Sequence, residues 1–367
     1  MSKSETKQPK EKNKILKRII DITLAVIIAG GAIYGINKIA NDSSDIDSSK
    51  QKNNEAFVDS NDSKLPSTNS ASYVSAMVDN EEIYSGALII VNEKTEYKGK
   101  EDTLVSMYDI LQNDGTDAYQ VESADVKIRM NAATALNNMI KAFAEETGKK
   151  DIVVGGGYRS IDFQKEQYEA DPEKAAAPGH SDYHTGYSVD FSISDGEDGF
   201  IDFEGQDEYK WFEENGYKYG FIVRFPKDKK DSTGYDYRPW HFRYVGAAHA
   251  YYIHKNNLSL EEYVDLLKGY EYNSDHLKFS DDNGNEYEAY YYPADMANTQ
   301  TSIAVPNTDY QKSGNNTDGF IIISQTKSEN SASEETTENT SENKTTDKAD
   351  EKSSENSDDS KAESTAE

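Results

Sequence analysis

The sequence predicts an α+β fold with antiparallel strand pairing, followed by a small β appendage. Between residues 71 and 270, short strand-like runs alternate with segments whose apolar residues recur at helical spacing. Residues 271–325 contain Tyr-rich, strand-like runs. The chain has 367 residues but is only 35% hydrophobic, which is low for a fully packed chain. A sizeable part of it is therefore expected to lie outside any core.

The first 40 residues have the pattern of a membrane anchor. Residues 1–18 carry seven Lys or Arg against two Glu, a net charge of +5. Residues 19–36 form an apolar run of 18 residues, which is short but sufficient to span a bilayer. The basic flank favours the cytoplasmic side, so we expect an anchor at 19–40 with the rest of the chain outside. A cleaved signal peptide is the alternative, although no small-x-small cleavage site follows Ile36.

Two further segments are too polar to fold alone. Residues 41–70 are rich in Asn, Asp, Ser and Lys and are expected to form a flexible linker. Residues 326–367 contain no Leu, Ile, Val or aromatic residue and carry 13 Asp or Glu against 5 Lys, which predicts a disordered acidic tail.

The whole chain has a net charge of −29, which excludes nucleic acid as a plausible partner. It has no cysteine, so disulfides and thiolate chemistry are excluded.

The elements of the folded part are predicted in order from Ala87–Val91, an apolar run expected to be a buried strand. A helix follows from Met130 to Phe143, with Gly148 placed to end it. The remaining predictions are strands at Ile152–Val154, Gly186–Ile193, Phe221–Phe225 and His241–Val245, and helices at Ser160–Glu169, Glu208–Asn215 and Ser259–Lys268. Ser160 is expected to cap its helix, and Ser259 with Glu262 to form a capping box.

Two stretches carry the residues on which chemistry could depend. They are residues 178–190, Pro-Gly-His-Ser-Asp-Tyr-His-Thr-Gly-Tyr-Ser-Val-Asp, and residues 237–246, Tyr-Arg-Pro-Trp-His-Phe-Arg-Tyr-Val-Gly. A carboxylate on one strand and imidazoles from a turn and a second strand could form a zinc site with an open position. The alternative is structural: Asp190 caps a loop and His241 is a buried, hydrogen-bonded side chain.

These stretches, together with Gly-Tyr-Arg-Ser at 157–160, resemble the VanY-type D-Ala-D-Ala carboxypeptidases over residues 85–255. Members of that family are zinc enzymes that remove the terminal D-alanine from peptidoglycan stem peptides. The resemblance implies a small central antiparallel sheet flanked by helices. It also implies zinc ligands at Asp190 and His241, and substrate-binding roles for Arg159, Ser181 and Trp240.

At two positions the chain departs from the family pattern. Tyr183 stands where the family has its first zinc-ligand His, and Arg238 stands where it has the catalytic Glu. Arginine cannot act as a base at physiological pH, and a neutral tyrosine is an uncommon zinc ligand. His184 is the candidate substitute ligand and His180 a weaker one.

Three hypotheses for function follow from these departures. The first is a membrane-anchored zinc D,D-carboxypeptidase that uses His184. The second, which we favour, is a catalytically weak or silent member that binds stem peptides. The third is an interaction module that uses the fold only as a scaffold. We also expect Arg238 to form a salt bridge with Asp190, with the Tyr183 hydroxyl bonded to Asp190 or His241, in a metal-free polar cluster.

Overall fold

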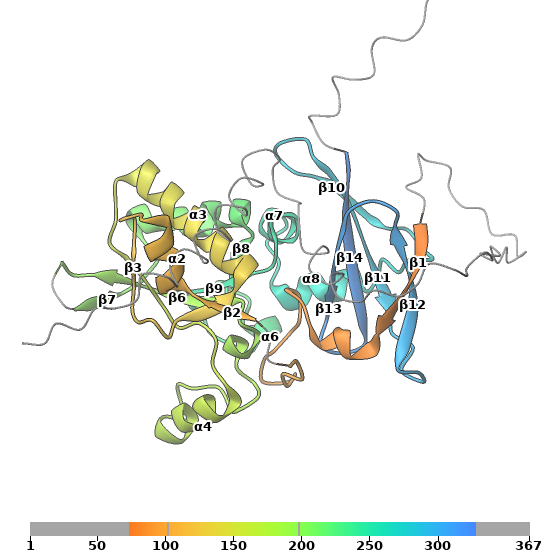
Figure 1. Ribbon diagram of the computed structural model, residues 1–367, viewed down its shortest axis with the longest axis horizontal. Coiled ribbons are helices and arrows are strands. Elements are labelled where there is room, and N and C mark those ends of the chain that lie inside the picture. The colour runs from red at the N-terminus through yellow and green to blue at the C-terminus, as the bar shows by residue number, and fades with distance from the viewer. Residues whose placement is uncertain (1–72, 101–102, 197–198, 328–367) are drawn as a thin grey trace, which may run out of the picture. The chain divides into compact units, whose positions relative to one another are not determined.

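The computed structural model describes residues 73–100, 103–196 and 199–327 (Figure 1). These residues belong to one compact unit. The predicted basic segment, anchor and linker lie outside the described residues, as does nearly all of the acidic tail. Within the described ranges, no helix is both long and apolar enough to cross a membrane.

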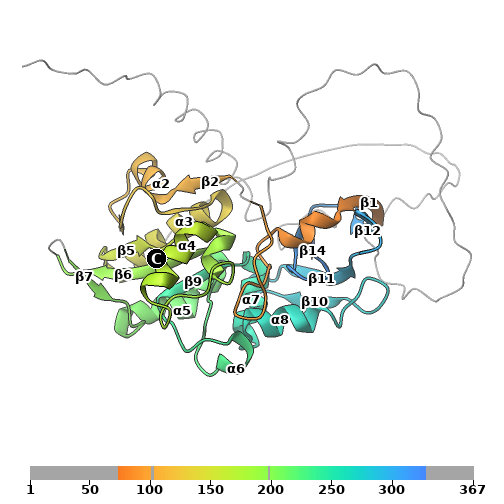
Figure 2. The same ribbon diagram turned by 90° about the horizontal axis from the view of Figure 1, so that it is seen from below.

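The central sheet has the strand order β3-β5-β6-β9-β8, with β7 pairing onto β6. Its strands are β3 (Gln120–Val121), β5 (Ile152–Gly155), β6 (Ser188–Ser194), β7 (Phe200–Asp202), β8 (Phe221–Val223) and β9 (His241–Tyr244). All neighbours are antiparallel except β3 and β5, which run parallel. Figure 2 shows β5, β6 and β9 side by side. The α+β fold with a small, mainly antiparallel central sheet is thus confirmed.

Helices flank this sheet. They are α2 (Met107–Asp114), α3 (Met130–Thr147), α4 (Ile161–Ala170), α5 (Lys210–Asn215), α6 (Lys230–Thr233), α7 (Ala247–Lys255) and α8 (Leu260–Leu267), with short 3-10 turns such as η2 (Asp182–Thr185) between them. A small pair, β2 (Leu104–Ser106) and β4 (Lys127–Arg129), precedes α3. The apolar face of α3 and the residues of β5 and β6 share one hydrophobic core, which includes Phe143, Ile152 and Phe191.

The helix ends follow the local chemistry of the sequence. Ser160 accepts a hydrogen bond from the backbone N–H of Phe163 at the start of α4. Ser259 and Glu262 form both halves of a capping box at α8. Gly148 ends α3 in the left-handed region at φ 75°, a conformation that glycine adopts without steric cost. These predictions are confirmed.

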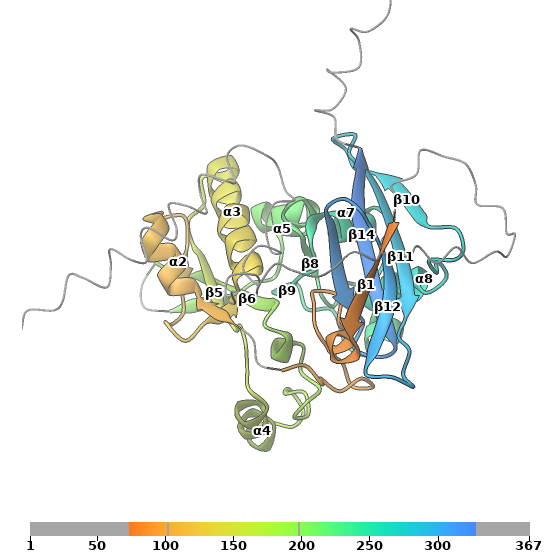
Figure 3. The same ribbon diagram turned by 45° about the vertical axis from the view of Figure 1, so that its right-hand side comes forward.

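The C-terminal strands are β10 (Leu277–Ser280), β11 (Glu286–Pro293), β12 (Gln300–Pro306), β13 (Tyr310–Gly314) and β14 (Gly319–Lys327). Four of them form a sheet of order β10-β11-β14-β13. The fifth, β12, pairs along its whole length with β1 (Tyr73–Asp79), as Figure 3 shows. The N-terminal strand of the described chain therefore belongs with the appendage strands and not with the central sheet.

The strand predicted at Ala87–Val91 is wrong. The segment is buried, but it lies in no ladder. Side chains take the place of a partner strand: the Arg243 Nη2 donates to the carbonyls of Ala87 and Ile89, each at 3.0 Å. Asn316 donates to the carbonyl of Ile90 at 2.8 Å. Buried backbone groups need partners but not strand partners, and the apolar composition alone does not distinguish the two.

Candidate functional site

The two stretches identified in the sequence meet at the pairing of β6 with β9. In that ladder Asp190 and His241 are directly opposite each other, and the His241 Nδ1 lies 2.7 Å from the Asp190 Oδ1. The Tyr183 hydroxyl, from the turn η2, donates a hydrogen bond to the other oxygen, Oδ2, of Asp190. Gly156 permits this close packing, because a Cβ there would lie 3.1 Å from the Tyr183 ring. Both oxygens of Asp190 are therefore engaged.

Asp182 is the buried centre of the site, and the sequence analysis missed it. Its Oδ1 accepts from Arg243 Nη1 at 2.5 Å and from Arg224 Nε at 3.2 Å. Its Oδ2 accepts from the Ser188 hydroxyl and lies 3.3 Å from His241 Nε2. An arginine inside the apolar run Phe221–Phe225 was the available signal, since a charge buried in a strand requires a counter-charge.

The buried charges extend from Asp182 to α8. The Arg224 guanidinium is fully buried and bonds in a bidentate manner to Glu261, at 2.9 and 2.6 Å. Two arginines and two carboxylates thus form a closed, paired group beneath the site. Bidentate pairs of this kind are geometrically specific, so the group holds η2, β8, β9 and α8 in fixed relation to one another.

The pKa shifts follow from these contacts. Burial alone would raise the pKa of Asp182, but the charges of Arg243 and Arg224 more than offset burial and hold it well below its usual range. Burial likewise opposes the ionised form of Asp190, yet the hydrogen bonds from His241 and Tyr183 lower its pKa. For His241, burial is outweighed by its two carboxylate partners, which raise its pKa. Burial and the adjacent Asp190 raise the pKa of Tyr183, so its hydroxyl stays protonated.

His184 does not join this cluster. Its Nδ1 lies 2.7 Å from the carbonyl oxygen of Arg159, and its Nε2 accepts from the N–H of Gly179 at 3.1 Å. Both ring nitrogens are therefore taken by backbone groups, and burial lowers its pKa. The placement runs against a role for His184 as a substitute ligand. His180 is also turned away, with its Nδ1 2.8 Å from the carbonyl oxygen of Asn92.

The predicted salt bridge between Arg238 and Asp190 is wrong. The Arg238 guanidinium instead lies over two aromatic rings, 4.8 Å from the centre of Tyr235 and 5.4 Å from that of Phe225. His241 is opposite Asp190 in the ladder and reaches the carboxylate first. The other half of the expectation, a Tyr183 hydroxyl on Asp190, is what the structure contains.

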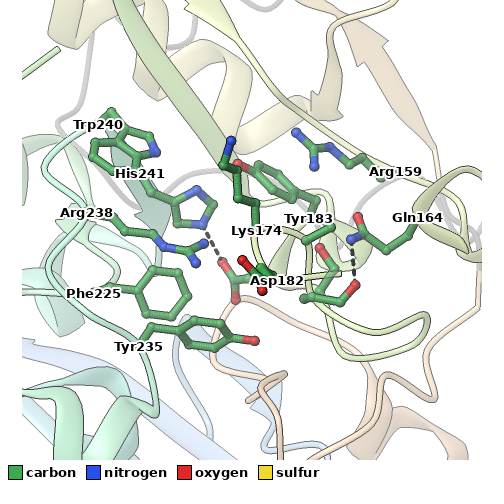
Figure 4. Close-up of a pocket in the computed structure, with 14 residues that line it drawn as sticks. Arg159, Gln164, Lys174, Asp182, Tyr183, Phe225, Tyr235, Arg238, Trp240 and His241 are labelled. Carbon is green, nitrogen blue, oxygen red and sulfur yellow. Dashed lines mark hydrogen bonds and ion pairs between the residues drawn. The ribbon is translucent and has the colours of Figure 1, made fainter. Parts of the chain in front are cut away.

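A cavity of about 440 Å³ opens over this cluster (Figure 4). Its volume is within the range of small-ligand sites. The residues expected to bind substrate, Arg159, Ser181 and Trp240, all line it. So do further residues that the sequence analysis did not single out: Gln164, Glu173, Lys174, Ala175, Ala176, Asp182, Phe225 and Tyr235.

The chain matches a known protein family. The family model for VanY, D-alanyl-D-alanine carboxypeptidase, matches residues 125–247. A D-alanyl-D-alanine carboxypeptidase of Enterococcus faecium is 36% identical over 248 residues, covering 66% of this chain and 76% of the relative. The chain belongs to the D-alanyl-D-alanine carboxypeptidase family. Two other curated relatives, a putative carboxypeptidase of Bacillus subtilis (40% identical) and a D-alanyl-D-alanine carboxypeptidase of Enterococcus faecalis (37% identical), are matched over only 55% and 48% of their own length.

A solved structure agrees with the family assignment. The vancomycin-resistance D,D-dipeptidase VanXYg, solved with a D-Ala-D-Ala phosphinate analogue, is 29% identical with a TM-score of 0.59. The match covers 69% of this chain and 98% of that one. A variant of the D,D-pentapeptidase VanY, 29% identical, was solved in complex with Zn(II). Its match covers 48% of this chain and 98% of that chain at a TM-score of 0.38. At that TM-score the arrangement of its site is not transferred to this chain.

The donor set of this member of the carboxypeptidase family does not fit zinc. Zinc sites in enzymes need three protein ligands plus an open position. Among the residues that the structure describes, no group of three or more His, Asp or Glu side chains is arranged to hold a metal ion. Asp190 and His241 bond to each other instead, and the third position holds the protonated hydroxyl of Tyr183.

Proposed function

We propose that this chain is a membrane-anchored, extracytoplasmic member of its family that binds peptidoglycan stem peptides and hydrolyses them weakly or not at all. The observation that carries the proposal is the Tyr183 hydroxyl on Asp190, in the place of a metal ligand. The +5 flank and the apolar run before residue 40 support the orientation.

Hydrolysis of an amide needs an activated water, and neither Asp190 nor Asp182 is available to activate one. Both oxygens of Asp190 are engaged by Tyr183 and His241. Asp182 is buried and bonded to two arginines. The position of the family's catalytic Glu holds Arg238, which cannot accept a proton at neutral pH. Loss of a general base alone typically lowers the rate by about 10²–10⁴.

The lining of the cavity, in contrast, is suited to binding a peptide. The cavity is lined by three cations, Arg159, Lys174 and Arg238, against two carboxylates, Glu173 and Asp182, while the chain as a whole has a net charge of −29. Such a local excess of positive charge favours an anionic ligand. The C-terminal carboxylate of a stem peptide is an anion of the right kind. Trp240 is 37% exposed at the cavity and provides an apolar surface for the peptide.

The test has two readouts on the purified full-length chain. Diacetyl-L-Lys-D-Ala-D-Ala should bind in a titration calorimeter, and Arg159→Ala should weaken the binding about tenfold or more, because a charge-assisted hydrogen bond is lost. D-alanine release with zinc supplied should remain near background. Lys278→Ala, at an exposed lysine on β10, is the charge-matched control. Chelator-sensitive turnover of about one per second would refute the silent-member proposal.

The location is tested separately. Protease added to intact wall-less cells should digest the folded part of the chain. Protection from the protease would refute the proposed orientation, and a soluble form beginning near residue 40 would show cleavage of the anchor.

A further inference from the structure

Arg159 lines the cavity, and its positive charge helps to lower the pKa of the Asp190 carboxyl without forming an ion pair with it. Its guanidinium stacks on the face of the Tyr183 ring, 3.8 Å from the ring centre. Across the described part of the chain, this side chain forms no ion pair. The ring holds the guanidinium in place without neutralising it, because a cation–π contact leaves the in-plane N–H donors free.

Arg238 is held in a similar way on the other side of Tyr183. Figure 4 shows Arg238 beside Phe225 and Tyr235, while Arg159 lies toward Gln164. The backbone on either side of Arg238 is fixed by two hydrogen bonds, its own N–H to the carbonyl of Phe225 at 3.0 Å and its carbonyl from the N–H of His241 at 3.2 Å. Its guanidinium, too, takes part in no ion pair with any residue that the structure describes.

The buried carboxylates near Arg159 and Arg238 are already bonded to other side chains. Asp182 and Glu261 pair with Arg224 and Arg243, and Asp190 is bonded by Tyr183 and His241. The remaining acid at the cavity, Glu173, is exposed. Two guanidinium groups, each with five N–H donors, therefore face the cavity without a counter-charge from the paired group beneath it.

A third feature indicates that the ligand also carries an N–H group. Gln164 is 1% exposed, and its Nε2 donates to the carbonyl of Ala176 at 2.8 Å. Its Oε1 is buried and accepts no hydrogen bond from any described residue. A buried acceptor without a partner is rare and costly, and a peptide N–H in the cavity would satisfy it.

We propose that Arg238 is a specificity-determining residue which, together with Arg159, makes the cavity a site for an acidic peptide bearing two carboxylates near its C-terminus. One carboxylate is bound by Arg159 and the second by Arg238, while Gln164 accepts from a backbone N–H between them. This inference rests on the proposed function, since it names the class of peptide that the same cavity selects. The position used for a base in the family thus serves for recognition in this chain.

The experiment compares peptides of equal length on the full-length chain by titration calorimetry. The probes are diacetyl-L-Lys-D-Ala-D-X, where X is Ala, Gln, Glu or Asp. D-Glu and D-Gln differ only in charge, and D-Asp tests a carboxylate with one methylene less reach. The better of the two acidic peptides should bind about tenfold or more tighter than the D-Gln peptide. Arg238→Gln should abolish that difference, whereas Lys278→Ala, far from the cavity lining, should leave it intact.

The outcomes separate the two proposals. Equal affinity for acidic and neutral peptides, or a preference that survives in Arg238→Gln, overturns the inference alone, provided that the D-Ala peptide still binds through Arg159. A preference lost equally in Lys278→Ala shows only general charge attraction and also overturns it. Failure of every peptide to bind refutes the proposed function and the inference with it.

Discussion

Asp182→Asn should destabilise the fold more than any change at the cavity surface. Its side chain is 3% exposed and accepts from Arg243, Arg224 and Ser188. Asparagine has nearly the same size but no charge, and its amide would bring a donor toward groups that are themselves donors. Arg224 would keep its pair with Glu261, whereas Arg243 would keep its bonds to the carbonyls of Ala87 and Ile89 but lose its carboxylate partner.

The magnitude follows from the two ion pairs that are lost. At an effective dielectric of about 20 and a charge separation of about 4 Å, each pair contributes roughly 4 kcal/mol. The desolvation of the Asp182 carboxylate, several kcal/mol, is recovered when its charge is removed. The net loss expected is about 3–5 kcal/mol, as is typical when one partner of a buried pair is removed. That is a large part of a usual stability of about 5–15 kcal/mol.

The assay is equilibrium urea unfolding of the full-length chain, followed by circular dichroism. Asp117→Asn is the matched control, since Asp117 pairs with Lys150 at an exposed site, and its midpoint should not change measurably. Adding Arg243→Met to Asp182→Asn should recover part of the loss, because one uncompensated cation is removed. A loss below about 1 kcal/mol for Asp182→Asn would refute the view that this buried group holds the site together.

Three other predictions concern metal, packing and pH. Tyr183→His with Arg238→Glu should retain close to one zinc per chain after dialysis, measured by elemental analysis; equal zinc in the unmodified chain would contradict the assignment of a metal-free cluster. Arg238→Ala alone should cost no more than about 1 kcal/mol in urea unfolding, because it removes ring stacking and no ion pair; a loss above about 3 kcal/mol would indicate a buried charge pair. His249, which accepts from or donates to the Tyr263 hydroxyl at 2.8 Å, has its pKa lowered to about 3 by burial. The pKa of His249 in the folded state lies below its value of about 6.5 in the unfolded state. Its contribution to stability is therefore fully present above pH 6.5 and is lost as the pH falls. Between pH 7 and pH 5 the free energy of unfolding should fall by about 2 kcal/mol more in the unmodified chain than in His249→Gln. Identical dependence of the unfolding free energy on pH in the two chains would count against burial of a neutral imidazole.

Local chemistry made much of the fold predictable. The caps at Ser160 and Ser259 and the left-handed Gly148 depend on groups within a few residues of each other, so the sequence contains all that is needed to place them. The strand predicted at Gly186–Ile193 is likewise present as β6, in which Asp190 is less buried than its neighbours Val189 and Phe191. The motif spacing was enough to name the family and three of the residues that line the cavity as substrate-binding candidates, Arg159, Ser181 and Trp240.

The sequence by itself identified Tyr183, Asp190 and His241 as site residues, but only the tertiary structure added Asp182 and decided which side chains bond to one another. Arg238 was expected on Asp190 because their charges are opposite, whereas the β6–β9 register places His241 there and leaves the guanidinium on two aromatic rings. The role of Asp182 depends on arginines 42 and 61 residues away. Strand register fixes which residues face each other, and burial requires that a charged side chain have a partner close by. Neither register nor burial can be predicted from the spacing of residues along the chain.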